Sequence, residues 1–430
     1  MWVVGVGISN FLLTLWHTQI EKIVKRETHN RLKRVAVIAL KAVVAMVMFL
    51  VLVVAATSVS PVYNFPEPVP FSGPDIFNPY RNLDTTHCWK RANFHTHTRV
   101  EGWANECEVW PQGVWDEYQK YGYDIVTFSN HNEITTHPFD RELQVNVYEH
   151  GYNLLKYHKL VFGSKDVNGF DHLLPIFAFQ RQWQMDMLLE ESDVVMLNHP
   201  LRTPFSSRGT MERLAGYHIM ELDSGKSTDN EYWDWALSAG HYSFGLANDD
   251  LHDPYRSSAI AVRSNFLCTP SGRWEDVRKV LLEGCYYSMR TPNYGGGDWD
   301  VKQAKNRSMP YVEDIGLRGD TIFIRLSEMA TSIEVIGENH TLLKKSEQTD
   351  VAEYRMERGD PYARFIVRFP EGEVLYSNPF ARYNVDFADS PFRKPAHRVN
   401  VALTVLWNTL LLVIVVGIIR GYRLLFKRRR

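Results

Sequence analysis

The sequence predicts an α/β domain followed by a smaller β-rich region, with apolar helices near both ends of the chain. Three patterns lead to this prediction. Segments with helical and strand-like patterns alternate through the middle of the chain. Short runs of alternating polar and apolar residues recur after Arg290, and two long stretches carry no charge. The 430 residues exceed what one hydrophobic core usually serves, so a main domain with attached segments is expected.

Residues 1–60 are predicted to form a membrane region. Residues 42–60 carry no charged side chain and are long enough to cross a bilayer core, which takes about 20 apolar residues. They lack the polar stripe of an amphipathic helix, and this disfavours the alternative of a buried core helix. Residues 1–20 are also rather apolar, and form either a further span or a helix in the membrane interface.

Residues 401–419 form the second uncharged stretch, and a basic tail follows at 420–430. Basic residues also precede the first stretch: Lys22, Lys25, Arg26, Arg31, Lys33, Arg34 and Lys41. Because basic residues that flank membrane spans tend to stay in the cytoplasm, both ends are predicted to be cytoplasmic. The sequence therefore predicts a multi-pass membrane protein whose main domain is extracytoplasmic.

Residues 61–88 are rich in proline and connect the first span to the main domain. The prolines are Pro61, Pro66, Pro68, Pro70, Pro74 and Pro79. Each proline ring fixes its own backbone angle and biases the preceding residue toward an extended shape. We expect a stiff stalk here.

The main domain is predicted at residues 89–290. A helical pattern precedes a strand-like run three times, at 114–121 before 123–128, at 185–191 before 194–197, and at 232–239 before the strand at Ser243. Helix and strand in regular alternation favour a parallel sheet with crossover helices.

A second, smaller domain is predicted at residues 311–383, after a break at Gly295–Gly297. Four short strand-like runs support it, at 321–326, 332–336, 362–369 and 373–376. Their alternation is typical of half-buried antiparallel strands. We expect a small β-sandwich-like domain that covers one side of the main domain and supplies no metal ligand.

His95 and His97 form a His-x-His at the end of a short predicted strand. Alternate residues of a strand share one face, so both imidazoles can reach one metal ion. Histidines buried for structural reasons are the alternative. Further His and acidic residues lie at or beside apolar runs: His131, Glu149, His172, His199, Asp250 and His252. Their number favours a metal centre.

This ordered series resembles the PHP (polymerase and histidinol phosphatase) family of metal-dependent phosphoesterases, and within it the branch of carbamate hydrolases of the CehA/McbA type. The resemblance implies a distorted barrel of parallel strands and helices, with its site at the carboxyl ends of the strands. It also implies the ligands of each metal. They are His95, His97 and Asp250 for the first metal, Glu149 as a bridge between two metals, His172 and His199 for the second, and His131 and His252 for the third.

Two positions depart from the family pattern. Asn130 stands where the family usually has Asp directly before the second-motif His, and Glu101-Gly102 stands where it usually has Ser-Asp-Gly. Both departures concern the third metal. Two or three ions are therefore predicted, with two favoured, and Glu101 is a further candidate ligand.

The ligand types suit divalent zinc, manganese or iron. A hydroxide that bridges two metals would hydrolyse an ester without a serine or cysteine nucleophile. Arg202, three residues after His199, and Arg256, four after His252, are the candidate catalytic cations, because a phosphoryl group develops negative charge as it reacts. Surface arginines are the alternative.

The predicted function is that of a membrane-anchored, metal-dependent phosphoesterase acting on a small-molecule or lipid-linked phosphate. One alternative is hydrolysis of a carbamate or carboxylic ester on the same metal scaffold. The other is a barrel without catalytic activity that serves as a binding or structural protein. A net charge of -2 gives no reason to expect nucleic-acid binding. Four cysteines, Cys88, Cys107, Cys268 and Cys285, form two disulfides or remain buried thiols.

Overall fold

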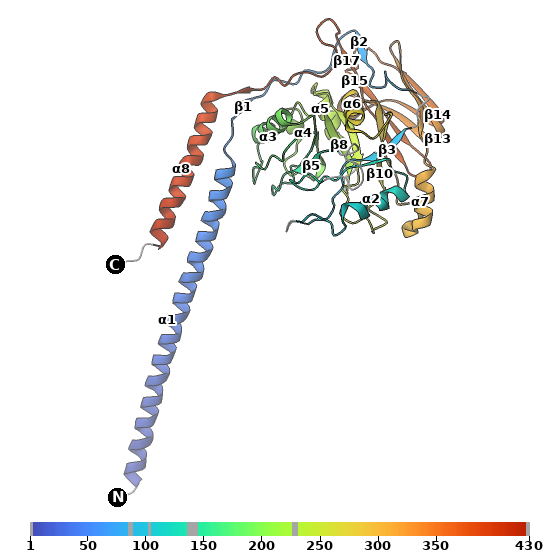
Figure 1. Cartoon of the computed structure of the whole chain (residues 1–430). Helices are drawn as coiled ribbons and strands as arrows, with labels where there is room; N and C mark the ends of the chain where they lie inside the picture. Colours follow the sequence, from blue (N-terminus) through green and yellow to red (C-terminus); the bar gives the residue numbers. More distant parts are fainter. Residues whose placement is uncertain (1–2, 85–88, 102–104, 136–144, 226–230, 427–430) are drawn as a thin grey trace. The chain divides into compact units, whose positions relative to one another are not determined.

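The computed structural model describes residues 3–84, 89–101, 105–135, 145–225 and 231–426. The chain divides into two compact units (Figure 1). One unit contains residues 1–59 and 405–430, and the other contains residues 60–404. Cys107, Cys268 and Cys285 are present as thiols, and Cys88 lies outside the described residues.

The first unit consists of α1 (Val3–Thr57) and most of α8 (Val401–Phe426). The segment Val24–Thr57 and the helix α8 are each long and apolar enough to cross a membrane. The two helices run antiparallel, since Lys41 Nζ donates to Leu425 O at 2.9 Å and Trp407 Nε1 donates to Ser58 O at 3.0 Å. The predicted N-terminal segment at residues 1–20 belongs to this same α1, which continues without a break from Val3.

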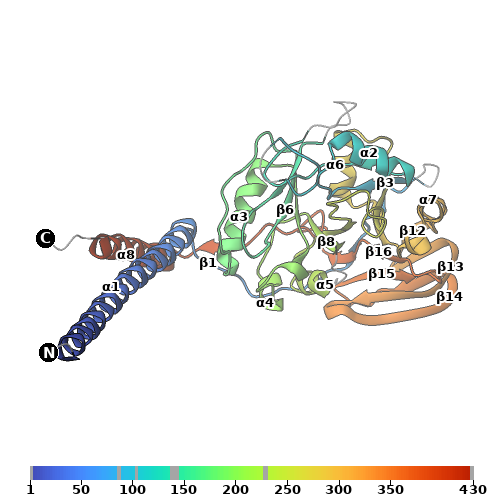
Figure 2. The same cartoon turned by 90° about the horizontal axis from the view of Figure 1, so that it is seen from below.

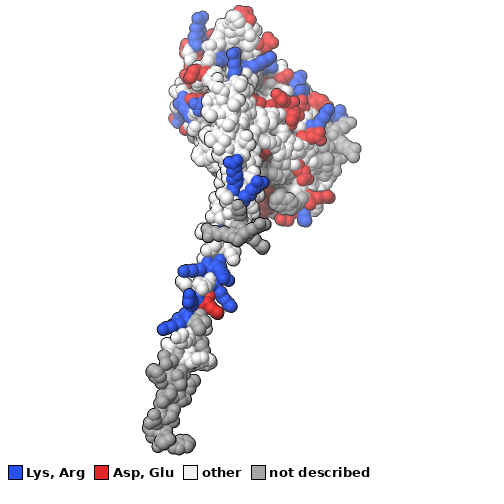
Figure 3. Space-filling model, turned by 90° about the vertical axis from the view of Figure 1, so that its left-hand side faces the viewer, with Lys and Arg blue, Asp and Glu red and all other residues white. Residues whose placement is uncertain are grey.

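Basic side chains gather on α1 ahead of the uncharged residues 42–60, and Figure 3 shows them as a blue group. Those of Lys22, Lys25, Arg26, Arg31, Lys33 and Arg34 are exposed. The apolar part of α1 and α8 is exposed as well, whereas a core helix of a soluble protein would be buried. A lipid environment would remove this apolar surface from water.

The second unit contains two large sheets and a two-stranded ribbon of β1 (Tyr63–Asn64) and β18 (Arg398–Val399). The larger sheet has the order β12-β13-β15-β16-β11-β10-β3-β4, with β14, β17 and β2 attached. Its strands are β2 (Asp75–Phe77), β3 (Lys90–Asn93), β4 (Ile125–Val126), β10 (Arg263–Leu267), β11 (Tyr286–Arg290), β12 (Val312–Arg318), β13 (Thr321–Gly337), β14 (Thr341–Arg355), β15 (Tyr362–Arg368), β16 (Val374–Ser377) and β17 (Phe380–Tyr383). The smaller sheet is β5 (Val147–His150), β6 (Lys159–Phe162), β7 (Val194–Leu197), β8 (Ile219–Ser224) and β9 (Phe244–Asn248), in that order.

The strand directions agree with the predicted parallel sheet only in part. β3 with β4, β7 with β8, and β8 with β9 pair in parallel, whereas β6 is antiparallel to both β5 and β7. The eight residues between β5 and β6 are too few for a parallel crossover, which needs a dozen or more. Two isolated parallel bridges, Thr96–Leu251 and His131–Glu149, connect the two sheets. The strands thus lie in two sheets rather than in one closed barrel sheet.

Helices flank these sheets close to where the sequence predicts them. They are α2 (Pro111–Lys120), α3 (Ala178–Glu191) and α5 (Glu231–Ser238), together with α4 (Arg208–Met211), α6 (Trp274–Glu283) and α7 (Trp299–Arg307). Proline at the first position of α2 leaves no backbone donor unsatisfied there. Gly284 ends α6 in the left-handed conformation that glycine adopts without strain. α7 directly follows the three glycines that predicted a flexible break.

The proline-rich segment does not stand away from the domain. Phe71, Phe77 and Tyr80 are buried in the hydrophobic cores of the second unit. β2 also pairs with β17, as Phe77 with Ala381. Burial of these aromatic side chains in the hydrophobic cores is more favourable in free energy than their exposure to water on an extended stalk.

The region predicted as a separate β-sandwich continues the larger sheet. β16 pairs with β11 of the main domain, and β15 pairs with β16, so the strands share one sheet (Figure 2). The β13–β14 hairpin and α3 lie at opposite ends of the unit in both views. A second hydrophobic core, in which Ile333, Val335 and Phe365 pack with Tyr287 and Met289 of β11, supports this region.

A buried ion pair joins this region to α5. Asp234 of α5 accepts hydrogen bonds from Arg364 Nε at 2.9 Å and from the Tyr362 hydroxyl at 2.9 Å, and His340 Nδ1 lies at 2.5 Å. Both Asp234 and Arg364 are fully buried. Burial alone would raise the pKa of the Asp234 carboxyl, but Arg364 and His340 outweigh burial and lower it.

We predict that Asp234→Asn destabilises the second unit by about 3–5 kcal/mol, because it leaves the buried Arg364 charge without its partner. Thermal or urea unfolding of the full chain in detergent would measure the change. Asp350→Asn, at an exposed position on β14, is the matched control and should be neutral. Equal stability of the two variants would contradict the prediction.

Candidate metal centre

His95 and His97 follow β3 and lie inside the second unit, with 0% and 1% of their surfaces exposed. Their Nε2 atoms face two carboxylates, Glu149 at the end of β5 and Asp250 just after β9. Each Nε2 is 3.3 Å from Glu149 Oε2 and 3.3 Å from Asp250 Oδ1. The four side chains form a buried group with the ligand atoms within 4.8 Å of one another.

This spacing fits a divalent metal ion. Ligands about 2.0–2.1 Å from a tetrahedral centre stand about 3.3–3.4 Å apart, which matches the four distances. Neither His95 Nε2 nor His97 Nε2 makes a hydrogen bond to a described atom, although both are buried. Buried polar atoms are almost always satisfied, so two buried nitrogens aimed at the same carboxylates are compatible with a divalent metal ion as their partner.

Glu221 of β8 fixes the orientation of His95. His95 Nδ1 donates to Glu221 Oε1 at 2.9 Å, so Nε2 is the nitrogen left to face a metal. Asn248 Nδ2 donates to the same oxygen at 3.1 Å, and the His199 backbone N–H donates to Glu221 Oε2 at 3.0 Å. The buried Glu221 carboxylate thus fixes the position of His95 relative to the segment that carries His199.

Glu149 faces a second group through its other oxygen. His158 Nδ1 lies 3.1 Å and His199 Nε2 lies 3.4 Å from Glu149 Oε1, and Asn198 donates to that oxygen at 2.8 Å. His131 Nε2 lies 3.2 Å from Oε2. Since imidazoles surround both oxygens, Glu149 is placed to be shared between two ions.

Glu106 gathers a third group at the edge of the site. Its Oε2 lies 3.2 Å from His131 Nε2, 3.3 Å from His252 Nε2 and 3.7 Å from His97 Nδ1. Hydrogen bonds from His131 and His252 hold the pKa of the Glu106 carboxyl well below its usual range. This group is more exposed than the other two.

The buried charges depend on one another. Burial would lower the pKa of His95, but the carboxylates of Glu149, Glu221 and Asp250 outweigh burial and raise it well above its usual value. Burial would likewise raise the pKa of Glu149, and His95, His131 and His158 hold it well below its usual value. Protons on the imidazoles and a metal ion are therefore competing ways of neutralising the same carboxylates.

Two site residues have strained backbones. His199 has a φ of 25° and Asp250 a φ of 50°, both in the left-handed region that side chains other than glycine rarely adopt. Such strain persists where the surroundings impose it, and it concentrates at functional sites. The hydrogen bonds to Glu221 and the contact of Asp250 with Arg202 supply that constraint here.

The structure brings most of the predicted site residues together. His95, His97, His131, Glu149, His199, Asp250 and His252 all take part in the contacts above. Arg202 also reaches the site, where its guanidinium forms an ion pair with Asp250 Oδ2. Arg202 is partly exposed, at 30% of its side-chain surface.

Three predicted residues lie elsewhere. Glu101 is exposed. The carboxylate that faces His131 is that of Glu106 and not that of Glu101. The His172 ring packs against Phe170 and Trp183, outside the three ligand groups of the described chain. Arg256 has 71% of its side chain exposed and faces Asp253 at 3.8 Å.

Asn130 does not contact the imidazole of its neighbour His131 in any described interaction. Its side chain accepts from the Thr98 backbone N–H at 2.8 Å and donates to the hydroxyls of Thr98 and Thr135. It therefore ties the loop after His97 to the loop that carries His131.

The sequence offers His158 only as one of several histidines that could line the site, with a structural role favoured, and it does not single out Glu106. His158 stands directly before β6, and because β6 runs antiparallel to β5, its start lies at the edge where β5 ends. Arg99 N donates to Val109 O at 2.7 Å, and this brings the segment of Glu106 back beside the segment that follows His97. A His one residue before the apolar run at 160–162 was the available signal for His158.

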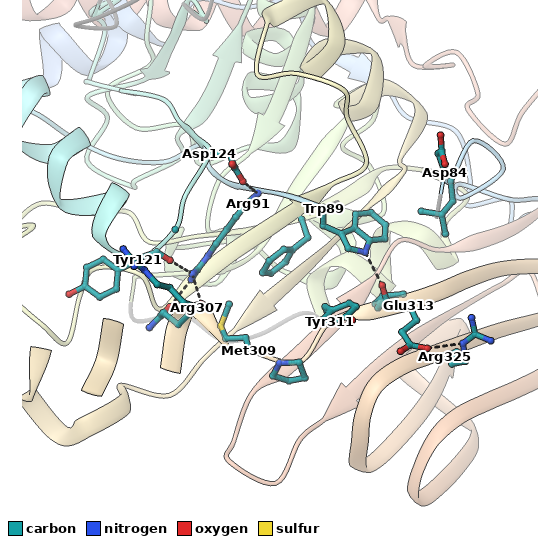
Figure 4. A pocket seen from close by; sticks show the side chains of 16 residues that line it. Asp84, Trp89, Arg91, Tyr121, Asp124, Arg307, Met309, Tyr311, Glu313 and Arg325 are labelled. Carbon is teal, nitrogen blue, oxygen red and sulfur yellow. Dashed lines mark hydrogen bonds and ion pairs between the residues drawn. The ribbon is translucent and has the colours of Figure 1, made fainter. Parts of the chain in front are cut away.

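A cavity of about 680 Å³ lies at the opposite end of β3 from the ligands (Figure 4). Arg91, Trp89 and Tyr311 line it. All five donors of the Arg91 guanidinium are engaged within the protein, among them with Tyr121 O at 2.7 Å and Asn306 Oδ1 at 2.6 Å. This cavity offers no free cation from Arg91 and no group of metal ligands.

Comparison with known proteins gives limited information. No protein-family model matches the sequence, and no curated protein matches it. The structure is similar to the crystal structure of a two-domain protein from Bacteroides vulgatus that contains a predicted PHP-like metal-dependent phosphoesterase. The identity is 13%, over 74% of this chain and 99% of that chain, and the TM-score is 0.36. A likeness at this level adds no argument, so the assignment of the site rests on its own geometry.

We predict that Glu149→Ala loses bound metal more completely than any other single change, because it removes a ligand from two groups at once. Substitution of a residue that hydrogen-bonds to a metal ligand lowers metal affinity by about 10- to 100-fold. We expect the removal of a ligand shared between two groups to lower it further. Glu106→Gln should lose only part of the metal. Elemental analysis of the purified full chain after dialysis would measure the content.

Glu101→Gln is the matched control, because Glu101 is an exposed carboxylate of the same loop. It should keep the wild-type metal content. Full occupancy in a folded Glu149→Ala variant, or equal losses in the variants of Glu101 and Glu106, would refute the assignment of the ligands.

Proposed function

We propose that the protein is a membrane-anchored, metal-dependent phosphoesterase. The observation that carries this proposal is the buried group of His95, His97, Glu149 and Asp250, with its 3.3 Å spacings and unpaired nitrogens. Divalent ions held by these residues would supply an activated water and neutralise the charge of a reacting phosphoryl group. Two or three ions of zinc, manganese or iron suit this mixture of imidazoles and carboxylates.

Arg202 supports a phosphate substrate over a neutral one. It is the cation in contact with a proposed ligand, Asp250, and its partial exposure leaves donors for a substrate. A guanidinium binds two phosphate oxygens in parallel, which suits it to hold the ester next to the ligand group. Gly225 lies next to the ion pair of Arg202 and Asp250. A Cβ at this position would lie 3.2 Å from Arg202 Nη1 and 3.3 Å from Asp250 Oδ2.

Hydrolysis of a carbamate or carboxylic ester on the same residues is the alternative function. Hydrolysis of such a substrate would need the metal ligands but no arginine to hold a phosphate. A non-catalytic barrel with a binding or structural role is disfavoured, because the burial of many ionisable groups without a cation to neutralise them costs free energy.

The membrane part of the proposal rests on the two apolar helices and on the basic residues beside them. The antiparallel contacts of α1 with α8 bring the basic residues of α1, and Arg420 and Arg423 of α8, to the same side. We therefore propose that both ends face the cytoplasm and that residues 60–404 face the other side.

Arg202→Met is expected to lower kcat/KM for a phosphate monoester by about 10- to 150-fold, since hydrogen bonds to charged groups contribute about 1.5–3 kcal/mol. The assay uses the metal-loaded full chain in detergent, with phosphate and carboxylic esters tested side by side. A chelator should abolish activity, and added divalent metal should restore it.

Arg256→Met is the matched control and should retain full activity, because the Arg256 side chain is exposed and its ion pair within the described chain is with Asp253. Metal content measured beside the rates separates a lost substrate contact from a lost metal. Hydrolysis of carboxylic esters alone, unaffected by Arg202→Met, would favour the alternative function.

The topology is tested with reporters fused to the chain. We expect a reporter that requires export to be active when fused after Asn64 and inactive when fused after Arg430. A fluorescent reporter that folds only in the cytoplasm should give the opposite pattern. Export of the reporter fused after Arg430 would overturn the proposed orientation.

A further inference from the structure

Four large apolar side chains are exposed on the loops that carry the candidate ligands. Tyr152 is 54% exposed and follows Glu149 by three residues, and Leu201 is 44% exposed and follows His199 by two. Tyr255, at 60%, follows His252 by three residues, and Phe205, at 61%, lies on the loop of Arg202. We call these four residues the apolar rim.

The covalent geometry keeps the rim close to the ligands. Consecutive Cα atoms are 3.8 Å apart, so a residue three positions from a ligand has its Cα within about 11 Å of it. Tyr152 is closer still, because its hydroxyl donates to His131 O at 2.9 Å and its ring centroid is 5.2 Å from that of His131. Phe205 is held beside Arg202 by a turn in which Ser206 N donates to Thr203 O.

Single exposed apolar residues are common on soluble proteins and need no explanation. The rim differs because its members come from three separate loops, each following a strand with a ligand at its end. The partly exposed cation of Arg202 lies on the same loop as Leu201 and Phe205. Loops that carry a cation together with exposed apolar side chains match a molecule with a phosphate at one end and an apolar body.

We propose that the apolar rim binds the apolar part of the ester, so that the substrate is a lipid-like or lipid-linked phosphate. This inference rests on the proposed phosphoesterase function and specifies its substrate class. Tyr152, Leu201, Phe205 and Tyr255 determine the preference for long-chain esters, and Arg202 holds the phosphate. A buried CH₂ group contributes about 0.8 kcal/mol, which corresponds to about fourfold in affinity.

The test compares ethyl phosphate with octyl phosphate as substrates of the metal-loaded full chain in lipid nanodiscs. Octyl phosphate has six more CH₂ groups, and burying only two of them predicts a kcat/KM at least about tenfold higher than that of ethyl phosphate. Phe205→Asn should reduce the octyl-to-ethyl ratio of kcat/KM. Asparagine is chosen because Phe205 has a φ of 62°, which asparagine tolerates.

Two further variants make the result specific. Phe205→Leu keeps an apolar side chain and should retain most of the ratio. Phe387→Asn removes an aromatic ring that is 87% exposed and lies outside the rim, so it should leave the ratio unchanged. A reduced ratio in Phe387→Asn would overturn the assignment of the preference to the rim.

The outcomes also separate this inference from the proposed function. Turnover of both esters at equal rates would overturn the inference and leave the phosphoesterase function standing. An equal loss on both esters in Phe205→Asn would show that the rim contacts something else, such as the bilayer or another copy of the chain. No turnover of either ester by the metal-loaded protein would overturn the proposed function, and this inference with it.

Discussion

The arrangement of the second unit depends on one buried carboxylate, that of Glu149. An ionised carboxylate removed from water loses several kcal/mol of solvation unless cations or donors replace the water. Here the replacement comes from five imidazoles on four different segments, including those of His95, His131 and His158. Each segment must reach the same place for this to work, so the course of the strands and the position of one negative charge are parts of the same constraint.

The β-rich region contributes to this constraint from outside the site. Asp223 Oδ1 of β8 lies 2.5 Å from Arg263 Nε, and Asp223 Oδ2 lies 3.1 Å from Arg290 Nε and accepts from the Tyr376 hydroxyl at 3.4 Å. The same strand carries Glu221, which orients His95. The strands β11 and β16 therefore support β8, although none of the three ligand groups in the described chain includes a residue of 311–383. Covering one face of the domain, as the sequence suggested, is only part of their role.

The sequence predicts those site residues that follow a strand of the expected direction. His95, His97, Glu149 and Asp250 come together because side chains at the ends of neighbouring strands meet at one edge. His158 was not predicted because its strand begins at that edge, and strand direction is a long-range property that local periodicity does not contain. The separate β-sandwich failed for the same reason. The runs at 362–369 and 373–376 do form strands, β15 and β16, but these strands are buried rather than half-buried. Their place in the sheet is set by the pairing of β16 with β11 and of β15 with β16.

The short ribbon formed by β1 (Tyr63–Asn64) and β18 (Arg398–Val399) has a consequence for how the chain is assembled. Tyr63 pairs with Val399 and Asn64 with Arg398, so the polypeptide enters and leaves the folded unit through adjacent positions about 5 Å apart. A unit whose ends meet in this way can be inserted into a tight connection without separating the segments on either side. Replacing the residues between Tyr63 and Val399 with another domain whose ends are equally close would therefore require no change in the flanking helices.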